Sequence, residues 1–161
     1  MKENFHSIKI FAGNNKNGNV YEELPAKPVE NEKYELLASP GLVLGLAKGD
    51  TITLNEGEYK LIKHGGNFCI QMYSTPVGND VLHKINAILA EISGSLDGQG
   101  GGALAFSAPI SSGFSSTNEA FNKIRELLDT EYYYSNIYKN PSDTSSQELT
   151  VWAQDLLNKE K

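Results

Sequence analysis

The chain has little cysteine, little arginine and no long apolar run. Its single cysteine, Cys69, excludes an internal disulfide and is typical of a reducing compartment. Arg125 is its one arginine and the net charge is −6, whereas nucleic-acid-binding proteins usually carry an arginine-containing basic stripe. No apolar run approaches the roughly 18 residues of a membrane span, and the first residues lack a secretory signal. We therefore expect a cytoplasmic protein that contacts neither nucleic acid nor membrane.

Residue patterns that carry chemistry are also scarce. His6, His64 and His83 have no metal-ligand spacing, so no metal and no cofactor are expected. The glycine-rich run at residues 98–103 leads into a strand instead of a helix, which favours a hairpin over a phosphate-binding loop. No catalytic residue is indicated and we expect no enzyme, although a His64 or His83 that meets a carboxylate in a cleft would favour a hydrolase.

Residues 1–66 read as a small β-rich subdomain. Short alternating runs predict several strands, at residues 5–11, 20–24, 33–38, 51–54 and 59–63. Pro25 and Pro28 place the connection between two of these strands at an edge or in a loop. Closely spaced turns between short strands predict a small antiparallel unit that resembles a β-barrel.

Residues 67–140 read as an α+β subdomain. A strand at 68–73 precedes apolar residues at helical spacing between Val81 and Ile92, with Asn79 as the expected N-cap. Two short strands around the glycine run follow, and Ser116-Thr117-Asn118-Glu119 matches a capping box that opens a second helix. A tyrosine-rich strand is expected at 131–138. The resulting order, βαββαβ, is ferredoxin-like, and one face of its sheet stays open unless the terminal segment or a partner covers it.

Residues 141–161 read as a polar linker and an amphipathic helix. The helix shows an apolar stripe, formed by Leu149, Trp152, Ala153, Leu156 and Leu157. It can dock on its own domain or exchange into a second chain. The whole chain is therefore expected to be α+β, with a β-barrel-like unit, a ferredoxin-like unit and a C-terminal helix.

Acidic and tyrosine residues of the second half are the candidates for partner binding. Most of the excess negative charge lies after residue 66. Alternation places Tyr132, Tyr134 and Tyr138 on one face of their strand and Tyr133 on the other. These faces either recognise a partner or pack under the helices. The expected interface residues are Asp97, Asp129, Glu131, Tyr132, Tyr134 and Trp152.

Two stretches carry a family resemblance. Residues 40–50 form an apolar run that ends in the Gly49-Asp50 turn, which Asp50 is expected to hold through nearby amides. Residues 103–110 form a strand that ends in proline. Together they resemble an uncharacterised bacterial domain family over roughly residues 5–140. The chain departs from it where Gly41 replaces an aromatic residue and where the helix with Trp152 is added.

The resemblance implies a function but no catalytic residues. Some members of this family look like immunity proteins that lie beside contact-dependent or polymorphic toxins. Our leading hypothesis is therefore a bacterial immunity protein that covers the active site of a basic toxin, such as a nuclease. The alternative is a regulatory domain that binds a small molecule or a peptide on the open face of the ferredoxin-like sheet.

Overall fold

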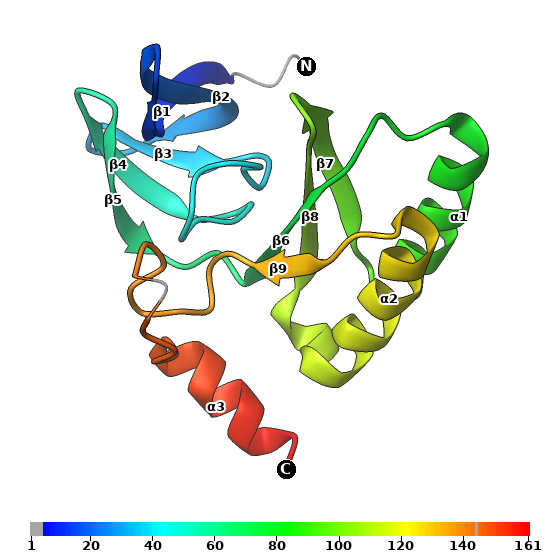
Figure 1. Cartoon of the computed structure of the whole chain (residues 1–161). Helices are drawn as coiled ribbons and strands as arrows, with labels where there is room; N and C mark the ends of the chain where they lie inside the picture. The colour runs from blue at the N-terminus through cyan, green and yellow to red at the C-terminus, as the bar shows by residue number, and fades with distance from the viewer. Residues whose placement is uncertain (1–4, 144) are drawn as a thin grey trace.

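The computed structural model describes residues 5–143 and 145–161, which form two antiparallel sheets and three α-helices (Figure 1). Residues 1–4 of the expected first unit and Thr144 of the expected linker lie outside the described residues. The sheets lie side by side, and two helices cover the outer side of the second sheet. This architecture confirms the predicted α+β class.

The first sheet follows the chain order, with each strand antiparallel to the next. Its strands are β1 (His6–Asn15), β2 (Gly18–Val29), β3 (Lys33–Leu36), β4 (Thr51–Asn55) and β5 (Glu58–Lys63). Ile10 and Ile52 point into its buried core, because side chains alternate across a strand. The sheet curls until the Phe11 N–H donates to the Gly57 carbonyl at 2.8 Å. No ladder joins the described parts of β1 and β5, so the barrel-like unit is a curled open sheet.

β2 runs further than predicted, because it continues through Pro25 and Pro28. Each proline lies where a neighbouring strand stops. β3 pairs with β2 from Ala26 onwards, just after Pro25, and the last described β1 pair, His6 with Ala26, precedes Pro28. Proline has no N–H to donate to a ladder, so a strand tolerates it where one neighbour is missing. The predicted end of this strand at residue 24 is therefore wrong.

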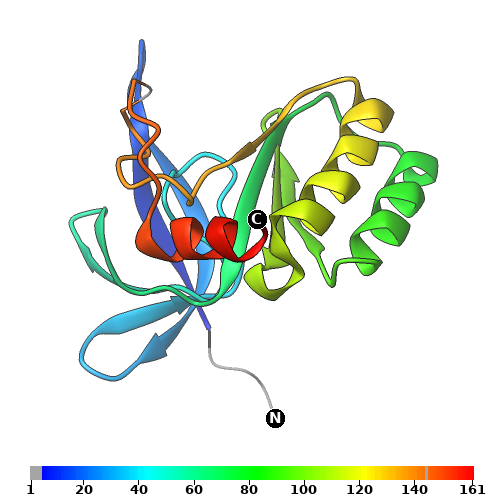
Figure 2. The same ribbon diagram turned by 90° about the horizontal axis from the view of Figure 1, so that it is seen from below.

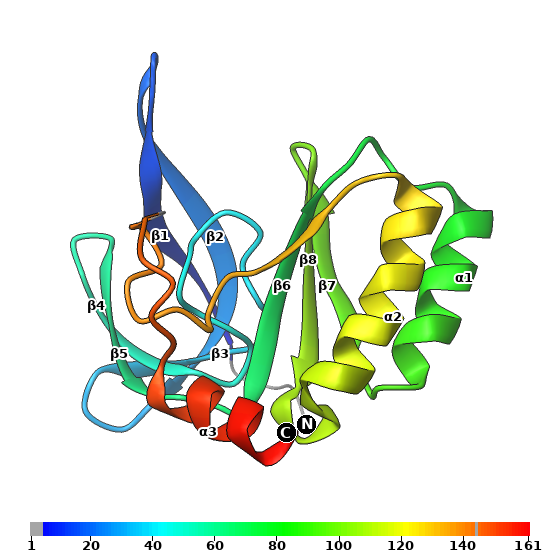
Figure 3. The same cartoon turned by 60° about the horizontal axis from the view of Figure 1, so that its bottom comes forward.

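The second unit has the predicted ferredoxin-like order. Its elements are β6 (Asn67–Tyr73), α1 (Asn79–Ala90), β7 (Ser95–Gly100), β8 (Ala103–Pro109), a short 3-10 turn (Ile110–Ser112), α2 (Gly113–Leu128) and β9 (Tyr132–Tyr134). The antiparallel strands lie in the order β7-β8-β6-β9. α1 and α2 cover one face (Figure 3), where Phe68, Ile70 and Met72 of β6 pack in the buried core.

β9 is shorter than the strand predicted at residues 131–138. It ends at Tyr134, and the chain then turns towards the first unit. The Ser135 carbonyl accepts the Gly45 N–H at 2.9 Å, and the Asn136 amide oxygen accepts the Cys69 N–H at 2.9 Å. Because these groups bond outside the ladder, the strand does not continue past Tyr134. Further along, Tyr138 pairs with Leu149 in an isolated bridge.

The loop between β3 and β4 covers the second face of the second sheet. Gln71 of β6 is buried, and its side-chain amide donates to the Pro40 and Val43 carbonyls, at 3.0 Å each. The other side of the same loop places Val43 and Leu46 in the core of the first sheet. The face that the sequence left open is therefore filled by the first unit, and this loop joins the two units.

α3 (Val151–Lys159) runs across the end of the molecule from the first sheet towards the start of α2 (Figure 2). Ala153 is buried against the second core, and Trp152 packs beside it. The Glu160 carboxylate accepts the Phe114 N–H at 2.8 Å and the Ser115 N–H at 2.9 Å. In this structure, therefore, the helix docks on its own chain.

The capping box predicted at residues 116–119 is wrong, because α2 begins earlier. The helix begins at Gly113, three residues before Ser116, and Thr117 is fully buried in it. The first free amides of a helix need an acceptor. Glu160 supplies that acceptor from the far end of the chain, which no local pattern indicates. No helix in the described ranges is both long enough and apolar enough to span a membrane.

Candidate functional site

Asp50 holds the turn that ends the loop between β3 and β4. Its side chain is buried, with an exposed fraction of 1%. Its Oδ2 accepts the Ala47 N–H at 2.9 Å, and its Oδ1 accepts the Gly65 N–H at 2.7 Å. A Cβ at Gly65 would overlap the Gly49 backbone, so this close approach requires glycine. The expected role of Asp50 is confirmed, and it also fixes the connection between β5 and β6.

His64 lies between Asp50 and the C-terminal helix. Its Nδ1 is 3.3 Å from Asp50 Oδ1, and its ring stacks on Trp152 with centroids 4.4 Å apart and planes 10° apart. A cavity of about 200 Å³ lies beside this stack, with Tyr59 and Tyr138 in its lining. Burial, together with the Asp50 charge, raises the pKa of Tyr59 above its ordinary value.

The His64–Asp50 pair meets the condition that would favour a hydrolase only in part. An aspartate beside one histidine nitrogen is the arrangement that orients a general base, whose other nitrogen must reach the substrate. Here His64 Nε2 is buried and has no hydrogen-bond partner among the described residues. In this conformation, therefore, the pair supports the turn and the His64 ring packs on Trp152, but the pair presents no base to the cavity.

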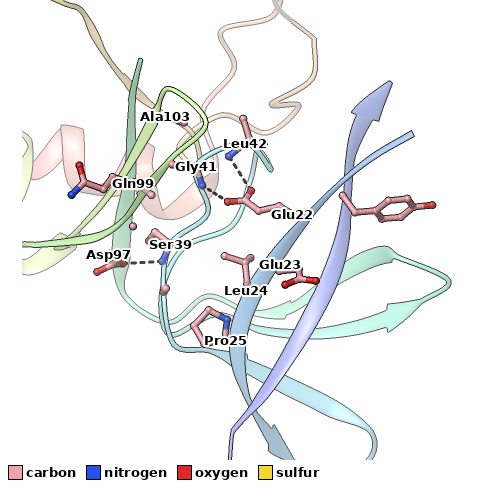
Figure 4. Close-up of a pocket in the computed structure, with 15 residues that line it drawn as sticks. Glu22, Glu23, Leu24, Pro25, Ser39, Gly41, Leu42, Asp97, Gln99 and Ala103 are labelled. Atoms are coloured by element: carbon pink, nitrogen blue, oxygen red, sulfur yellow. Dashed lines mark hydrogen bonds between the residues drawn. The ribbon is translucent and has the colours of Figure 1, made fainter. Parts of the chain in front are cut away.

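A groove of about 350 Å³ lies at the seam between β2 and the β7–β8 hairpin (Figure 4). Glu22 projects from β2 and accepts the main-chain N–H groups of Gly41, Leu42 and Val43 at 2.7, 2.9 and 2.9 Å. Asp97 projects from β7 and accepts the Ser39 N–H at 2.8 Å. The two carboxylates thus hold the loop from opposite sides and form the polar part of the groove.

Asp97, expected to contact a partner, is partly buried and bonded to several groups of its own chain. In addition to the Ser39 amide, it accepts hydrogen bonds from the Ser95 and Ser107 hydroxyl groups. The Ser39 hydroxyl in turn lies 2.6 Å from that of Ser107 and accepts the Lys48 N–H at 2.9 Å. The structure therefore gives Asp97 a role in holding the loop.

Tyr132 and Tyr134 lie on the inner face of β9, as the alternation predicts. Both are partly buried against the second core, and both hydroxyl groups donate to the Asn118 side chain, at 3.1 and 2.6 Å. Burial raises the pKa of each tyrosine above its ordinary value. Trp152 is likewise packed, on His64 and Phe68. The structure thus gives these three aromatic residues packing contacts.

Asp129 and Glu131, in contrast, lie exposed in a hollow of about 420 Å³ at the end of α2. Glu126 and Tyr133 line the same hollow, and we call these four residues the acidic hollow. Tyr133 is 54% exposed and Tyr73 is 51% exposed, with their ring centroids 6.4 Å apart. The alternation of side chains had already placed Tyr133 on the outer face of β9. This pattern is the sequence signal from which Tyr133 could have been included in the expected interface.

The electrostatics of the acidic hollow are one-sided. Glu131 lies 3.5 Å from Arg125, the single cationic residue among the described residues of the lining. Glu126 and Asp129 make no ion pair within the described residues. Those residues also contain no group of three or more histidine, cysteine, aspartate or glutamate side chains that could hold a metal ion. The hollow is therefore an open acidic and aromatic surface.

The comparisons with known proteins identify a family and a fold. A solved structure, a hypothetical protein from Neisseria gonorrhoeae, is 18% identical, with a TM-score of 0.61 over 84% of this chain and 96% of that chain. At this identity the likeness shows the fold alone. No curated protein matches the sequence. The model of the family described as "Domain of unknown function (DUF4265)" matches residues 22–131, from Glu22 in the groove to Glu131 in the acidic hollow. This match spans more than half of the chain, which therefore belongs to that family of unknown function.

Proposed function

We propose that this protein is a non-enzymatic bacterial immunity protein that binds a basic toxin domain at the acidic hollow. The observation that carries the proposal is the placement of Glu126, Asp129 and Glu131 beside the exposed ring of Tyr133. Carboxylates such as those of Glu126 and Asp129, which make no ion pair within the described residues, attract a basic surface over a distance. They can also occupy positions that a nuclease offers to phosphates.

The neighbouring tyrosines would supply the contact area. Tyr133 and Tyr73 present two adjacent exposed rings on β9 and β6. Tyrosine offers a large and rigid surface with a polar end, which is why it is enriched at the centres of protein interfaces. The acidic rim would then steer the partner while the rings anchor it. Neutralisation by this route requires no chemistry in the immunity protein, which would act in the cytoplasm where the toxin does.

The test is co-expression and co-purification with the product of the gene immediately upstream. The proposal expects a stable complex and rescue from growth arrest by the wild-type chain. A variant that combines Glu126→Gln, Asp129→Asn and Glu131→Gln removes the charge with little change in shape, and we expect its affinity to fall about tenfold or more, or about 1.4 kcal/mol.

A matched control carries the same loss of charge on the first sheet. Glu30, Glu56 and Glu58 are exposed and lie on hairpins of that sheet, so the corresponding three Gln substitutions should leave binding within about twofold of wild type. The proposal fails if no complex forms, or if the hollow variant and the control variant bind the partner equally well.

A further inference from the structure

The groove in Figure 4 is lined in part by four very small residues, which we call its floor: Gly98, Gly100, Ala103 and Ala105. Gly98 pairs with Ala105, and Gly100 pairs with Ala103, across the β7–β8 hairpin. Directly paired residues lie on the same face of a sheet, so all four face the same side. That side is the one covered by the loop, because the Cβ positions of Ala103 and Ala105 lie 3.5 and 3.8 Å from where a Cβ of Gly41 would lie.

The fold itself does not require glycine at positions 98 and 100. Gly101 and Gly102, at the tip of the hairpin, have φ values of 59° and 82°, which favour glycine. Gly98 and Gly100 are not in this left-handed region, and a Cβ added to either would meet no atom of the described residues within 4 Å. Glycine inside a strand costs roughly 0.5–1 kcal/mol relative to alanine. The two residues therefore keep space open, as expected where another backbone approaches a strand closely.

The exposed edge of β7 offers main-chain groups to such a backbone. β7 is the outermost strand of its sheet. Gly100 and Ala103 flank the two-residue turn, where the paired residues exchange hydrogen bonds. Alternation then directs the main-chain N–H and C=O of Gln99 away from β8, towards the free edge. An extended segment can pair there as an additional strand.

The groove also carries negative charge with room for a donor. A carboxylate offers about four lone-pair positions. Glu22 uses three of them on the loop amides, and Asp97 uses three on Ser39, Ser95 and Ser107. Neither has an ion-pair partner within the described residues, whereas Glu23 at the rim lies 3.7 Å from Lys9. Each carboxylate therefore keeps about one lone-pair position that a basic side chain of a bound segment can fill.

We propose that this groove binds an extended peptide segment of another protein, which pairs with the edge of β7 and places a lysine or arginine side chain in the groove that Glu22 and Asp97 line. The aliphatic part of that side chain covers the floor of Gly98, Gly100, Ala103 and Ala105, and its cationic end reaches the carboxylates. This site is separate from the acidic hollow, and it does not depend on toxin binding.

The first experiment titrates the ¹⁵N-labelled full chain with the acetylated and amidated pentapeptide Thr-Val-Lys-Val-Thr. We expect saturable shifts of the Gly98, Gln99 and Gly100 amide signals. The control peptide Thr-Val-Glu-Val-Thr has the same strand propensity and the opposite charge, and should leave these signals unchanged. Absence of shifts with the lysine peptide, or equal shifts with both peptides, would overturn the proposal.

The second experiment fills the groove without straining the fold. Gly98→Leu and Gly100→Leu each project a side chain into open space, so the melting temperature should not fall, and binding of the lysine peptide should weaken at least tenfold. Gly78 is a matched control, because a Cβ there also meets nothing and its φ is −72°. Gly78→Leu and the triple hollow variant should bind like wild type. Wild-type affinity in both groove variants would refute the site.

Discussion

Two sets of carboxylates in this acidic protein have opposite environments. Glu22, Asp50 and Asp97 point inward and accept main-chain N–H groups. Most of these amides belong to the loop between β3 and β4. Glu126, Asp129 and Glu131 point into open solvent at the end of α2. The sets have the same formal charge, yet one holds the loop in place and the other lies exposed to solvent.

The difference follows from what each set lies against. Residues 37–50 form neither helix nor strand, so their amides find no partner in a regular ladder. A buried N–H without an acceptor is costly, and carboxylates from β2, β7 and the loop's own end supply the missing acceptors. The end of α2, in contrast, has its last amides satisfied locally, with the Asp129 N–H donating to the Arg125 carbonyl. Its acidic side chains are therefore left to the solvent.

Asp50→Asn should lower the stability of the protein more than any other change considered. The asparagine amide group can replace only one of the two acceptor oxygens, so either Ala47 or Gly65 would face an N–H₂ group instead of an oxygen. Loss of a charged and buried acceptor costs about 3 kcal/mol. We expect the urea midpoint to fall accordingly. Asp155→Asn, on the exposed side of α3, should leave it unchanged, and equal stability of the two variants would contradict the assigned role of Asp50.

Glu22→Gln should have the next largest effect. One of its oxygens serves Leu42 and Val43, and the other serves Gly41. Glutamine keeps one acceptor oxygen and loses the charge, so the free energy of unfolding should fall by about 2 kcal/mol. Hydrogen exchange should report faster opening at residues 41–43 than at β6. Uniform acceleration across both regions would contradict a local role in the loop.

The second unit could be predicted from the sequence because its signals are local. Helical spacing between Val81 and Ile92, the glycine hairpin and the alternation of Tyr132, Tyr133 and Tyr134 each depend on neighbouring residues. The apolar run at residues 41–47 has no period of its own. Glu22 holds this run, and Asp97 holds Ser39 just before it. Both carboxylates are far away in the chain, and such pairings leave no mark in local spacing.

The candidate site was predicted only in part for the same reason. Asp129 and Glu131 lie in the exposed hollow, as expected for charged residues at the polar end of a helix. The sequence around Asp97 suggests exposure equally, but its carboxylate accepts hydrogen bonds from Ser39, Ser95 and Ser107. Only the three-dimensional arrangement brings those groups together. Similarly, the cap of α2 comes from Glu160 across 45 or more residues.

A rise in pH should destabilise the protein through the buried thiol of Cys69, whose pKa depends in part on two of the inward-pointing carboxylates. Burial first, and then the Asp97 and Glu22 charges, raise the pKa of its thiol from 9.0 to about 12, although the Ser135 and Ser39 side chains act to lower it. Above pH 9 the unfolded chain loses this proton while the folded chain keeps it, so stability falls as pH rises towards 12. The expected fall is about 1.4 kcal/mol per pH unit. Serine does not ionise in this range, so Cys69→Ser should show a shallower decline between pH 9 and 11, and parallel declines would contradict the assignment.

The smallest effect on stability is expected at the acidic hollow. The triple variant Glu126→Gln, Asp129→Asn and Glu131→Gln removes one exposed ion pair, that of Glu131 with Arg125, and relieves repulsion among three like charges. Exposed pairs contribute little, so the free energy of unfolding should change by less than about 0.5 kcal/mol. Asp129 has a φ of 51°, which asparagine also adopts readily, so the end of α2 should stay intact. Urea unfolding at low and at high salt measures the effect. A loss comparable to that of Asp50→Asn would show that these carboxylates also hold the fold, and the distinction between the two sets would then disappear.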